Sequence, residues 1–373
     1  MKTLAFPASE RPLISVVVVT FGDDVEVIRV ALEALAKHTD VPYELVIVDN
    51  DPERTRPALD WVAGATVVTN VENRGFAAAC NQGALWARGR HILFMNPDVY
   101  VRAGWAGPLM EVLEEDKRVG TCGPLILYPD ERLQLAGALL ANSGSTTMYG
   151  ERDRPDRPEY GFRRVVDYLS GACLLIRRSA FDSVGGFDAA FGRAYFEDAD
   201  LGVTLAADGW RSVYEPRSVV VHVGGASGTA ATLGEQARRN RGIFEERWRG
   251  VLRSRPYSPL AASERRLAAS RDAPASCRIL VLAGHEAALQ ALELCPGARV
   301  TAVGTREDSS VDLAARGIEA FPADALGALL ESRRFHYDAV LGVTPDAAEP
   351  LALTQPQALL VGRPEELPAA GCA

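Results

Sequence analysis

The stretch His91-Ile-Leu-Phe-Met-Asn-Pro-Asp98 runs apolar from Ile92 to Met95 and then ends in a polar tip. A short apolar run of this kind predicts a strand of a parallel sheet that is buried on both faces. Ligands of open α/β sheets bind beyond the carboxyl ends of the strands, which makes Asp98 a candidate for holding a divalent metal ion. The alternative is that Asn96-Pro97-Asp98 is only a turn, and the tripeptide by itself favours that alternative.

Two further apolar runs predict neighbouring strands of the same sheet. Ile14–Thr20 is rich in β-branched residues, and Tyr43–Asp49 has the same character; a weaker strand is predicted over residues 65–69. The alternation of such strands with helical patterns is typical of βαβ units and a parallel sheet. Because the carboxyl ends of parallel strands lie along one edge, Thr20, Asp49 and Asp98 are expected to meet there. The first intervening helix is predicted from the apolar residues Val27, Ile28, Ala31, Leu32 and Leu35.

A chain of 373 residues is long enough for two domains. We expect an α/β domain over residues 1–255, a linker rich in Ala, Ser and Arg over 256–276, and a small α/β domain over 277–373. The predicted strands of the small domain cover residues 278–283, 299–303 and 337–343.

A basic helix predicted over residues 232–252 has two interpretations, which the sequence leaves open. Arginines surround an apolar set that includes Phe244 and Trp248. Such a helix can lie on an anionic membrane surface, which would make the protein peripheral to a membrane. Alternatively, its apolar side packs on its own domain.

Composition excludes several classes of protein. The net charge of -9 argues against a nucleic-acid-binding protein, because no basic field would attract phosphate backbones. Six scattered cysteines without a CxxC pair fit reduced thiols better than disulfides or a zinc site. The sequence has neither a signal-peptide pattern nor an apolar run long enough to span a membrane. We therefore expect a cytoplasmic protein, at most peripheral at the inner face of the cell membrane.

The polar residues offer the groups that moving a sugar from a nucleotide requires. The leaving diphosphate is most simply neutralised by a metal ion, for which Asp98 and Asn96 offer oxygens and His222 a nitrogen. The acceptor hydroxyl must lose its proton to a placed carboxylate. Glu197 and Asp198 stand at a predicted helix start, where the helix dipole favours an ionised carboxylate. The alternatives are ordinary helix capping for the two carboxylates and a core imidazole for His222.

With these residues identified, the first 250 or so residues resemble the family 2 glycosyltransferases of the GT-A fold, and in particular their rhamnosyltransferase-like branch. That fold has a Rossmann-like, mostly parallel sheet. No single motif is decisive, but eight occur in the right order. They are Val16-Val-Val-Val-Thr-Phe21, Val48-Asp-Asn50, Asn73-Arg-Gly-Phe-Ala-Ala-Ala-Cys-Asn81, Asn96-Pro-Asp98, Ser170-Gly-Ala172, Gly185-Gly-Phe-Asp188, Glu197-Asp-Ala-Asp-Leu201 and Val221-His222 with Ser227.

The resemblance implies a role for each matching position. Asp198 would be the base of a single inverting displacement, with Glu197 as a second catalytic carboxylate. Asp98 and His222 would hold the metal ion, Mg²⁺ or Mn²⁺. The acceptor would meet Gly171, Ala172 and Asp200. The nucleotide-sugar would be bound by Thr20, Phe21, Asp49, Asn73, Gly75, Asn81, Asn96 and Asp98.

Two departures from the family pattern, and a separate resemblance of the C-terminal domain, carry expectations of their own. Asn-x-Asp stands at residues 96–98 in place of Asp-x-Asp, which leaves one carboxylate for the metal ion. The Gln-x-x-Arg-Trp motif of processive synthases is absent, so one sugar per encounter is expected. The C-terminal domain faintly resembles a Rossmann-like S-adenosylmethionine methyltransferase. The first strand of this domain leads into Leu282-Ala-Gly-His-Glu-Ala287, where a single glycine leaves a cofactor little room near the backbone. We therefore expect the C-terminal domain to be non-catalytic.

The sequence thus predicts a metal-dependent, inverting glycosyltransferase of cell-surface polysaccharide or glycoconjugate synthesis. It would move one sugar from a dTDP-rhamnose-like or UDP-sugar donor to a saccharide or lipid-linked saccharide acceptor. One alternative is a non-catalytic sugar-nucleotide-binding scaffold, which the absence of Asp98, Asp198 or His222 would have favoured. Another is a nucleotidyltransferase, which would need a basic, glycine-rich loop where this chain has the acidic Thr20-Phe-Gly-Asp-Asp24.

Overall fold

The structure is a computed structural model that describes most of residues 3–252 and parts of residues 278–361. The gaps in the first region are residues 8, 23, 52–58, 141–142, 157–159, 162 and 225–229. In the second region the described residues are 278–282, 284–294, 299–304, 313, 318–321, 326, 330, 337, 339–342 and 359–361. Ser227 and the predicted linker 256–276 lie outside the described residues.

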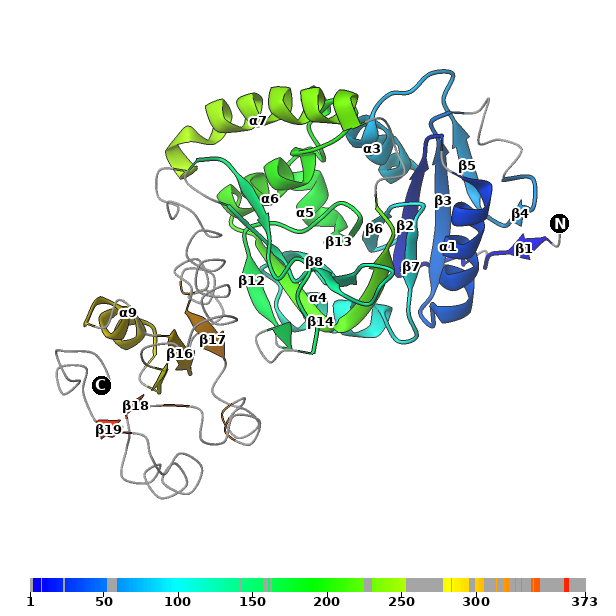
Figure 1. The fold of residues 1–373 in the computed structure, drawn as a ribbon. Coiled ribbons are helices and arrows are strands. Elements are labelled where there is room, and N and C mark those ends of the chain that lie inside the picture. Colours follow the sequence, from blue (N-terminus) through cyan, green and yellow to red (C-terminus); the bar gives the residue numbers. More distant parts are fainter. Residues whose placement is uncertain are drawn as a thin grey trace. The chain divides into compact units, whose positions relative to one another are not determined.

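Two compact units divide the chain, one built mainly from residues up to 253 and the other mainly from residues 254 onward (Figure 1). The first half of the first unit contains β1 (Leu4–Ala5), β2 (Ile14–Thr20), α1 (Val25–His38), β3 (Tyr43–Asp49), β4 (Val62–Ala63), β5 (Thr66–Thr69), α3 (Phe76–Trp86), β6 (His91–Met95), β7 (Val99–Val101) and α4 (Ala106–Glu115). There follow β8 (Val119–Leu127), β9 (Leu133–Leu135), β10 (Ala138–Leu140), β11 (Thr146–Met148), β12 (Arg164–Val166), β13 (Cys173–Arg177), α5 (Arg178–Ser183), the 3₁₀ helix η2 (Ala189–Phe191), α6 (Glu197–Ala207), β14 (Arg211–His222) and α7 (Ala230–Leu252).

One ten-stranded sheet organises this unit, with the strand order β12-β14-β8-β13-β6-β2-β3-β5, β7 paired with β14 and β9 paired with β8. Strands β5, β3, β2 and β6 are mutually parallel, as predicted. In the other half β14 runs parallel to β8, whereas β13 runs antiparallel to both β6 and β8, and β7 runs antiparallel to β14. The predicted GT-A-type sheet therefore contains antiparallel strands beside its parallel ones. Short strands such as β7 lack a long apolar run, which is why the sequence pattern missed them.

The central strands form because their residues are apolar on both faces and both faces are covered. Every residue of β2, β3 and β6 is buried. Helix α3 packs against β2 and β3. Helix α1 begins after Asp24, whose carboxylate accepts the Glu26 backbone N–H, and it buries Ile28, Ala31, Leu32 and Leu35 at the predicted spacing. These packed layers hold the carboxyl ends of the strands in fixed positions.

Helix α7 runs past α6 on the outside of the unit (Figure 1). Its Phe244 and Leu252 are buried, with 0% and 3% of their surface exposed. The Phe196 ring lies 5.4 Å from that of Phe244. These contacts favour internal packing as the interpretation of the basic helix. None of the helices in the described ranges is both long and apolar enough to cross a membrane.

The second unit contains a five-stranded sheet with the order β17-β16-β15-β18-β19, in which each strand runs parallel to its neighbours. Three of its strands match predicted ones, and β17 and β19 were not predicted. A core that includes Ile279, Val281, Val300 and Leu341 covers one side of the sheet. The elements are β15 (Arg278–Val281), α9 (His285–Leu294), β16 (Arg299–Val303), β17 (Glu319–Phe321), β18 (Ala339–Leu341) and β19 (Leu359–Val361).

Candidate active site

The polar ends of the parallel strands meet at one edge of the sheet, as the sequence predicts. Thr20 lies opposite Asp49 in the β2–β3 pairing, and both are fully buried. Strand β6 ends at Met95, which pairs with Val18, so the residues that follow β6 emerge at the same edge. The Thr20 hydroxyl is buried and has no hydrogen-bond partner among the described residues, which leaves it free to bind a ligand. Phe21, the next residue, is half-buried.

A network of asparagines shapes the loop that follows β5. The Asn50 Oδ1 accepts from Asn70 Nδ2 at 2.8 Å and from the Arg74 backbone N–H at 3.2 Å. The Asn73 Oδ1 accepts from Asn50 Nδ2 at 3.1 Å and from the Gly75 N–H at 2.8 Å. The predicted site residues Asn73 and Gly75 therefore lie beside the end of β3. Asn50 and Asn70 had no predicted role, although Asn50 directly follows Asp49.

Gly75 is required at its position for two reasons. Its φ of 83° lies in the left-handed region, which favours glycine. A Cβ atom there would lie 2.3 Å from the Gly192 carbonyl oxygen. The next residue, Phe76, donates its backbone N–H to the Arg193 carbonyl at 3.1 Å. The loop at Gly75 is thus joined directly to the segment that precedes α6.

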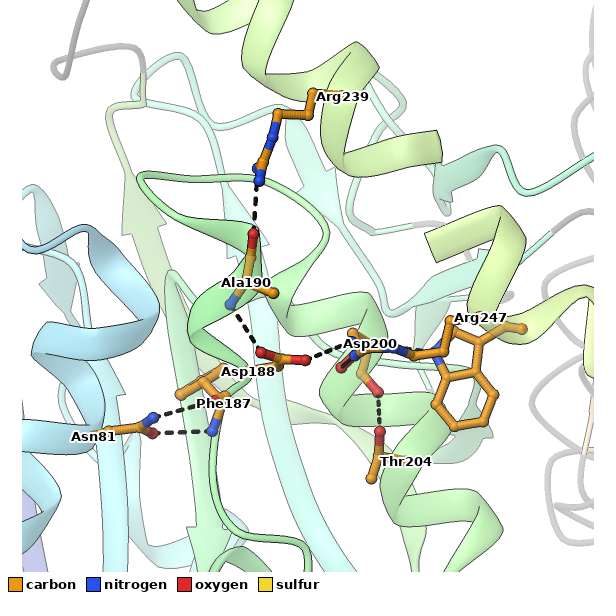
Figure 2. Close-up of polar contacts among 9 residues, drawn as sticks. Asn81, Phe187, Asp188, Ala190, Asp200, Thr204, Arg239 and Arg247 are labelled. Atoms are coloured by element: carbon orange, nitrogen blue, oxygen red, sulfur yellow. Dashed lines mark hydrogen bonds and ion pairs between the residues drawn. The ribbon is translucent and has the colours of Figure 1, made fainter. Parts of the chain in front are cut away.

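Asn81 is held by backbone groups. Its Nδ2 donates to the Phe187 carbonyl at 2.7 Å, and its Oδ1 accepts the Phe187 N–H at 2.9 Å (Figure 2). Both ends of the amide therefore bind the Gly185-Gly-Phe-Asp188 loop. These contacts give Asn81 a structural task, and they lend no support to its predicted contact with a nucleotide.

Asp98 and His222 lie together although 124 residues separate them in the sequence. The pairing of β7 with β14 sets His222 opposite Val99. The His222 Nε2 lies 3.2 Å from Asp98 Oδ1 and 3.3 Å from the Asn96 side-chain nitrogen. Asp98 Oδ2 accepts the Gly224 N–H at 2.9 Å. The structure thus gathers a carboxylate, an imidazole and an amide at one point.

Gln134 on β9 fixes the orientation of the His222 ring. The His222 Nδ1 lies 2.7 Å from Gln134 Oε1, and Gln134 Nε2 donates to the His222 carbonyl at 3.4 Å. Since Oε1 can only accept, Nδ1 carries a proton, and Nε2 is the ring nitrogen that faces Asp98. A hydrogen bond to the far nitrogen is also how proteins orient metal-binding histidines.

The electrostatics at Asp98 favour its ionised form. Burial by itself would raise the pKa of Asp98, whose exposed fraction is 4%. Hydrogen bonding and charge interaction with His222, together with the Gly224 N–H, outweigh burial and hold the pKa below its ordinary value. An ionised carboxylate, an imidazole nitrogen and an amide form a donor set that suits a divalent ion. In the described part of the chain, no group of three or more His, Cys, Asp or Glu side chains is arranged so that it could hold a metal ion.

The segment Ser170-Gly171-Ala172 links this cluster to the second pair of carboxylates. The Ala172 carbonyl accepts the Asn96 N–H at 2.9 Å. The Gly171 N–H donates to Asp198 Oδ2 at 3.2 Å. A Cβ atom on Gly171 would lie 3.1 Å from the Phe76 ring, so the segment is tightly enclosed. Two adjacent residues therefore connect the strand-end cluster to Asp198.

Glu197 and Asp198 begin α6 but differ in their surroundings. Asp198 is partly exposed and accepts N–H groups from Gly171 and Ala199, the latter at 2.8 Å. Glu197 is buried, and its Oε2 has no hydrogen-bond partner among the described residues. Burial first, and then the charge of Asp198, raise the pKa of Glu197 to about 8. Burial also raises the pKa of Asp198, against the pull of its backbone donors.

The expectation that the helix start keeps both carboxylates ionised is therefore wrong for Glu197. Burial, which the sequence does not reveal, outweighs the helix dipole. The backbone N–H groups favour the charged form of Asp198, so Asp198 ionises first and Glu197 keeps its proton near neutral pH.

Replacing Glu197 by glutamine is expected to change how stability depends on pH. The native protein keeps the Glu197 proton up to a pKa of about 8, whereas the unfolded chain loses it near 4.5. Between these values the native state binds more protons, so the free energy of unfolding falls as pH rises, by at most about 1.4 kcal/mol per pH unit. Urea unfolding at pH 5, 6.5 and 8 should show this fall in wild type and a weaker one in Glu197→Gln. Parallel curves for the two proteins would contradict the protonated state of Glu197.

Asp200 is directed into the protein instead of toward an acceptor. It is buried, and Arg247 Nη1 donates to both of its oxygens, at 2.9 and 3.0 Å (Figure 2). The Trp248 Nε1 donates to Asp200 Oδ1 at 2.7 Å, and Arg247 Nη2 also binds Asp188 Oδ2 at 2.5 Å. These contacts bind both oxygens of Asp200 to α7 and lend no support to its predicted role in acceptor binding. No sequence pattern indicated that its partners lie on α7.

The sequence of this chain matches two family models and several known proteins. The family model described as glycosyl transferase family 2 matches residues 15–185, and the one described as glycosyl transferase family group 2 matches residues 159–296. The N-acetylglucosaminyl-diphospho-decaprenol L-rhamnosyltransferase of Mycobacterium tuberculosis is 31% identical over 241 residues, which cover 56% of this chain and 76% of that protein. The rhamnosyltransferase WbbL of Escherichia coli is 24% identical over 224 residues, which cover 56% of this chain and 83% of WbbL.

A solved structure supports the fold. The crystal structure of GalNAc-T7 with UDP, GalNAc and Mn²⁺ aligns with a TM-score of 0.51 at 18% identity. The alignment covers 70% of this chain and 54% of that one, so this chain spans about half the length of its structural relative. At this identity the likeness concerns the fold alone.

Proposed function

Since this chain belongs to the family 2 glycosyltransferases, in their rhamnosyltransferase-like branch and with their GT-A fold, we propose that it transfers one sugar with inversion from a nucleoside-diphosphate donor. The chain is a glycosyltransferase of glycan synthesis. The proposed donor is a dTDP-rhamnose-like or UDP-sugar, and the proposed acceptor is a saccharide or a lipid-linked saccharide. The name of the mycobacterial relative, an L-rhamnosyltransferase of a diphospho-decaprenol compound, supports both choices.

The nucleoside half of the donor would bind at the ends of β2 and β3. The free hydroxyl of buried Thr20 and the Asp49 carboxylate offer polar groups there. The Asn73–Gly75 loop, held by Asn50, would close one side of this pocket. Backbone at Gly75 can approach a ligand closely because no side chain stands in the way.

Asp98, His222 and Asn96 would hold a divalent ion, Mg²⁺ or Mn²⁺. Their chemistry fits, because a carboxylate oxygen of Asp98 and the Nε2 of His222, both atom types that bind divalent ions, face each other at 3.2 Å. Phosphate oxygens of the donor would complete the ligand set, since Asp98, His222 and Asn96 leave positions of a six-coordinate ion open. When bound, the ion supplies Lewis-acid neutralisation of the leaving diphosphate.

Asp198 would remove the proton from the attacking acceptor hydroxyl. It is partly exposed, whereas Glu197 is buried, so Asp198 is the carboxylate that an acceptor can reach. The N–H groups of Gly171 and Ala199 orient its oxygens and favour the ionised form that a base requires. Glu197, which keeps a proton, would hold the neighbouring position neutral and so spare Asp198 from like-charge repulsion.

One observation carries the proposal most directly. Gly171 binds Asp198, and the adjacent Ala172 binds Asn96, at 3.2 and 2.9 Å. A single short segment thus keeps the proposed base next to the proposed diphosphate site. Transfer requires this proximity, because the acceptor must attack the sugar carbon that bears the diphosphate.

Incubation with a panel of nucleotide-sugars, candidate acceptors and Mn²⁺ or Mg²⁺ tests the proposal. We expect release of a nucleoside diphosphate from one donor and a product heavier than the acceptor by one sugar. Donor binding without release from any donor would favour the alternative, a non-catalytic sugar-nucleotide-binding scaffold.

We also propose that residues 1–255 form the catalytic domain and residues 277–373 a non-catalytic, Rossmann-like domain. The parallel sheet β17-β16-β15-β18-β19 supports the second assignment. A cytoplasmic location belongs to the same proposal. Membrane contact through α7 is not part of the proposal, because Phe244 and Leu252 of that helix are buried within the protein.

A further inference from the structure

The segment that leads into Glu197 and Asp198 has an unusual backbone. Tyr195 and Phe196, the two residues before Glu197, have φ values of 71° and 72°. Residues other than glycine seldom adopt this left-handed region, because their Cβ crowds the neighbouring carbonyl. Two such residues in succession persist only where the surrounding structure holds them. The position of the proposed base, Asp198, therefore depends on the contacts that keep Tyr195 and Phe196 in this conformation.

Asn240 on α7 is the residue that holds it. Its side chain is fully buried, and its Nδ2 donates to three carbonyls, those of Phe191 at 2.5 Å, Ala194 at 2.8 Å and Tyr195 at 2.9 Å. The amide has two N–H groups, so three acceptors share two protons. A segment bound at three carbonyls by one side chain has little freedom to adopt another path.

The Asn240 amide is itself held by its neighbours on α7. Its Oδ1 accepts from Gln236 Nε2 and from Arg239 Nη1, both at 3.0 Å. Gln236 also donates to the Phe191 carbonyl at 3.0 Å, and Arg239 donates to the Ala190 carbonyl at 3.2 Å (Figure 2). These bonds fix which end of the amide is the donor. The NH₂ group must face the segment.

The segment also touches the proposed donor site. Arg193 accepts the Phe76 N–H, and the Gly192 carbonyl lies against Gly75. At its other end, the Phe196 carbonyl accepts the Asp200 N–H at 2.9 Å and so begins the hydrogen bonds of α6. Residues 191–196 therefore connect the Asn73–Gly75 loop of the proposed donor site to the first turn of α6, where Asp198 lies.

We propose that Asn240 is a positioning residue for the transfer reaction: through residues 191–196 it sets the place of Asp198 relative to the donor. This inference rests on the proposed function, in which Asp198 is the base. It assigns to α7 a part in catalysis without contact to either substrate.

Asn240→Asp tests the inference, because it keeps the shape of the side chain and its Oδ1 while it replaces the donating NH₂ by an acceptor. We expect kcat to fall by about 100-fold, since small misplacement of a catalytic group has effects of this size. The Kd for the nucleoside diphosphate should change less than about threefold, because the donor pocket is built largely by other residues. Arg241→Gln is the matched control. Arg241 lies next to Asn240 and pairs with Glu245 on the same helix, and the control should transfer at the wild-type rate.

A double-mutant cycle separates positioning from a general loss of structure. In an Asp198→Asn background, Asn240→Asp should change the residual rate less than about threefold, because the group that it positions is already gone. Equal fold-losses in both backgrounds, or a kcat like that of the Arg241→Gln control, would overturn the inference. If Asp198→Asn alone transfers at near wild-type rate, the proposed base is wrong and the inference falls with it, which is a distinguishable result.

A second variant covers the case in which Asn240→Asp does not fold. Gln236→Leu removes one donor to Phe191 and one to Asn240 from a half-buried position. We expect a smaller fall of kcat, about tenfold, with the same pattern in the cycle. An unchanged kcat in a folded Gln236→Leu protein would count against the inference.

Discussion

Replacing Asp198 by asparagine is expected to lower kcat for sugar transfer by about 10²- to 10⁴-fold, the range that general-base catalysis contributes. The amide has nearly the same shape but cannot accept the acceptor's proton. Asp198 is partly exposed and accepts backbone N–H groups from Gly171 and Ala199, whereas the adjacent carboxyl of Glu197 is buried and keeps its proton. The rate is measured as product formation with the donor that the panel identifies.

Donor binding by Asp198→Asn should match that of wild type, because the proposed donor contacts lie elsewhere. Calorimetric titration with the nucleoside diphosphate measures this. Asp182→Asn is the matched control, since Asp182 is an exposed aspartate on α5. Its rate should be that of wild type. If Asp198→Asn transferred sugar as fast as this control, the assignment of the base would be wrong.

Changes at His222 and Gln134 are expected to weaken metal binding in a graded way. Asn-x-Asp supplies a single carboxylate, so the affinity for the ion should depend strongly on the His222 nitrogen. We expect His222→Ala to lose most transfer at low Mn²⁺ concentration and to regain part of it at high concentration. Gln134→Leu leaves the imidazole in place but frees its ring, and should weaken Mn²⁺ binding by about 10- to 100-fold, as loss of a group that orients a ligand does.

The affinity for Mn²⁺ is measured directly by titration in the presence of a nucleoside diphosphate, separately from turnover. His38→Ala is a suitable control, since His38 ends α1 and is not one of the proposed ligands. Equal Mn²⁺ affinity in wild type, His222→Ala and Gln134→Leu would exclude His222 as a ligand. It would also leave Asp98 without its proposed partner.

The sequence predicted the part of the site that depends on chain-local patterns. Apolar runs located β2, β3 and β6, and the geometry of parallel strands then placed Thr20, Asp49 and Asp98 at one edge. The motif order supplied His222, which no local pattern would connect with Asp98. The family and the GT-A fold followed from the same motifs, and the comparisons confirm both.

What the sequence could not predict are the partners that folding brings from far away. An asparagine amide binds a ligand or a backbone with the same groups, so nothing in the sequence revealed that Asn81 is held by Phe187, 106 residues later. Asp200 shows the same difficulty, because Arg247 lies on a helix that the sequence left open to two interpretations. Gln134 lies on a three-residue strand, too short for any periodic pattern.

The burial of individual side chains could not be predicted from the sequence either. Glu197 and Asp198 are adjacent carboxylates at one helix start, and the helix dipole acts on both. Only the fold reveals that Glu197 is enclosed while Asp198 stays partly exposed. Burial raises the pKa of Glu197 to about 8, so Glu197 keeps its proton, whereas Asp198 is the proposed base.

The anomeric configuration of the transferred sugar tests the central claim most directly. A single displacement, with Asp198 as base and the diphosphate leaving from the opposite face, must invert the configuration at the sugar carbon. The one-bond carbon–proton coupling at that carbon, read by NMR in donor and product, distinguishes the two configurations. We expect opposite configurations in donor and product, and the same configuration in both would rule out a single displacement.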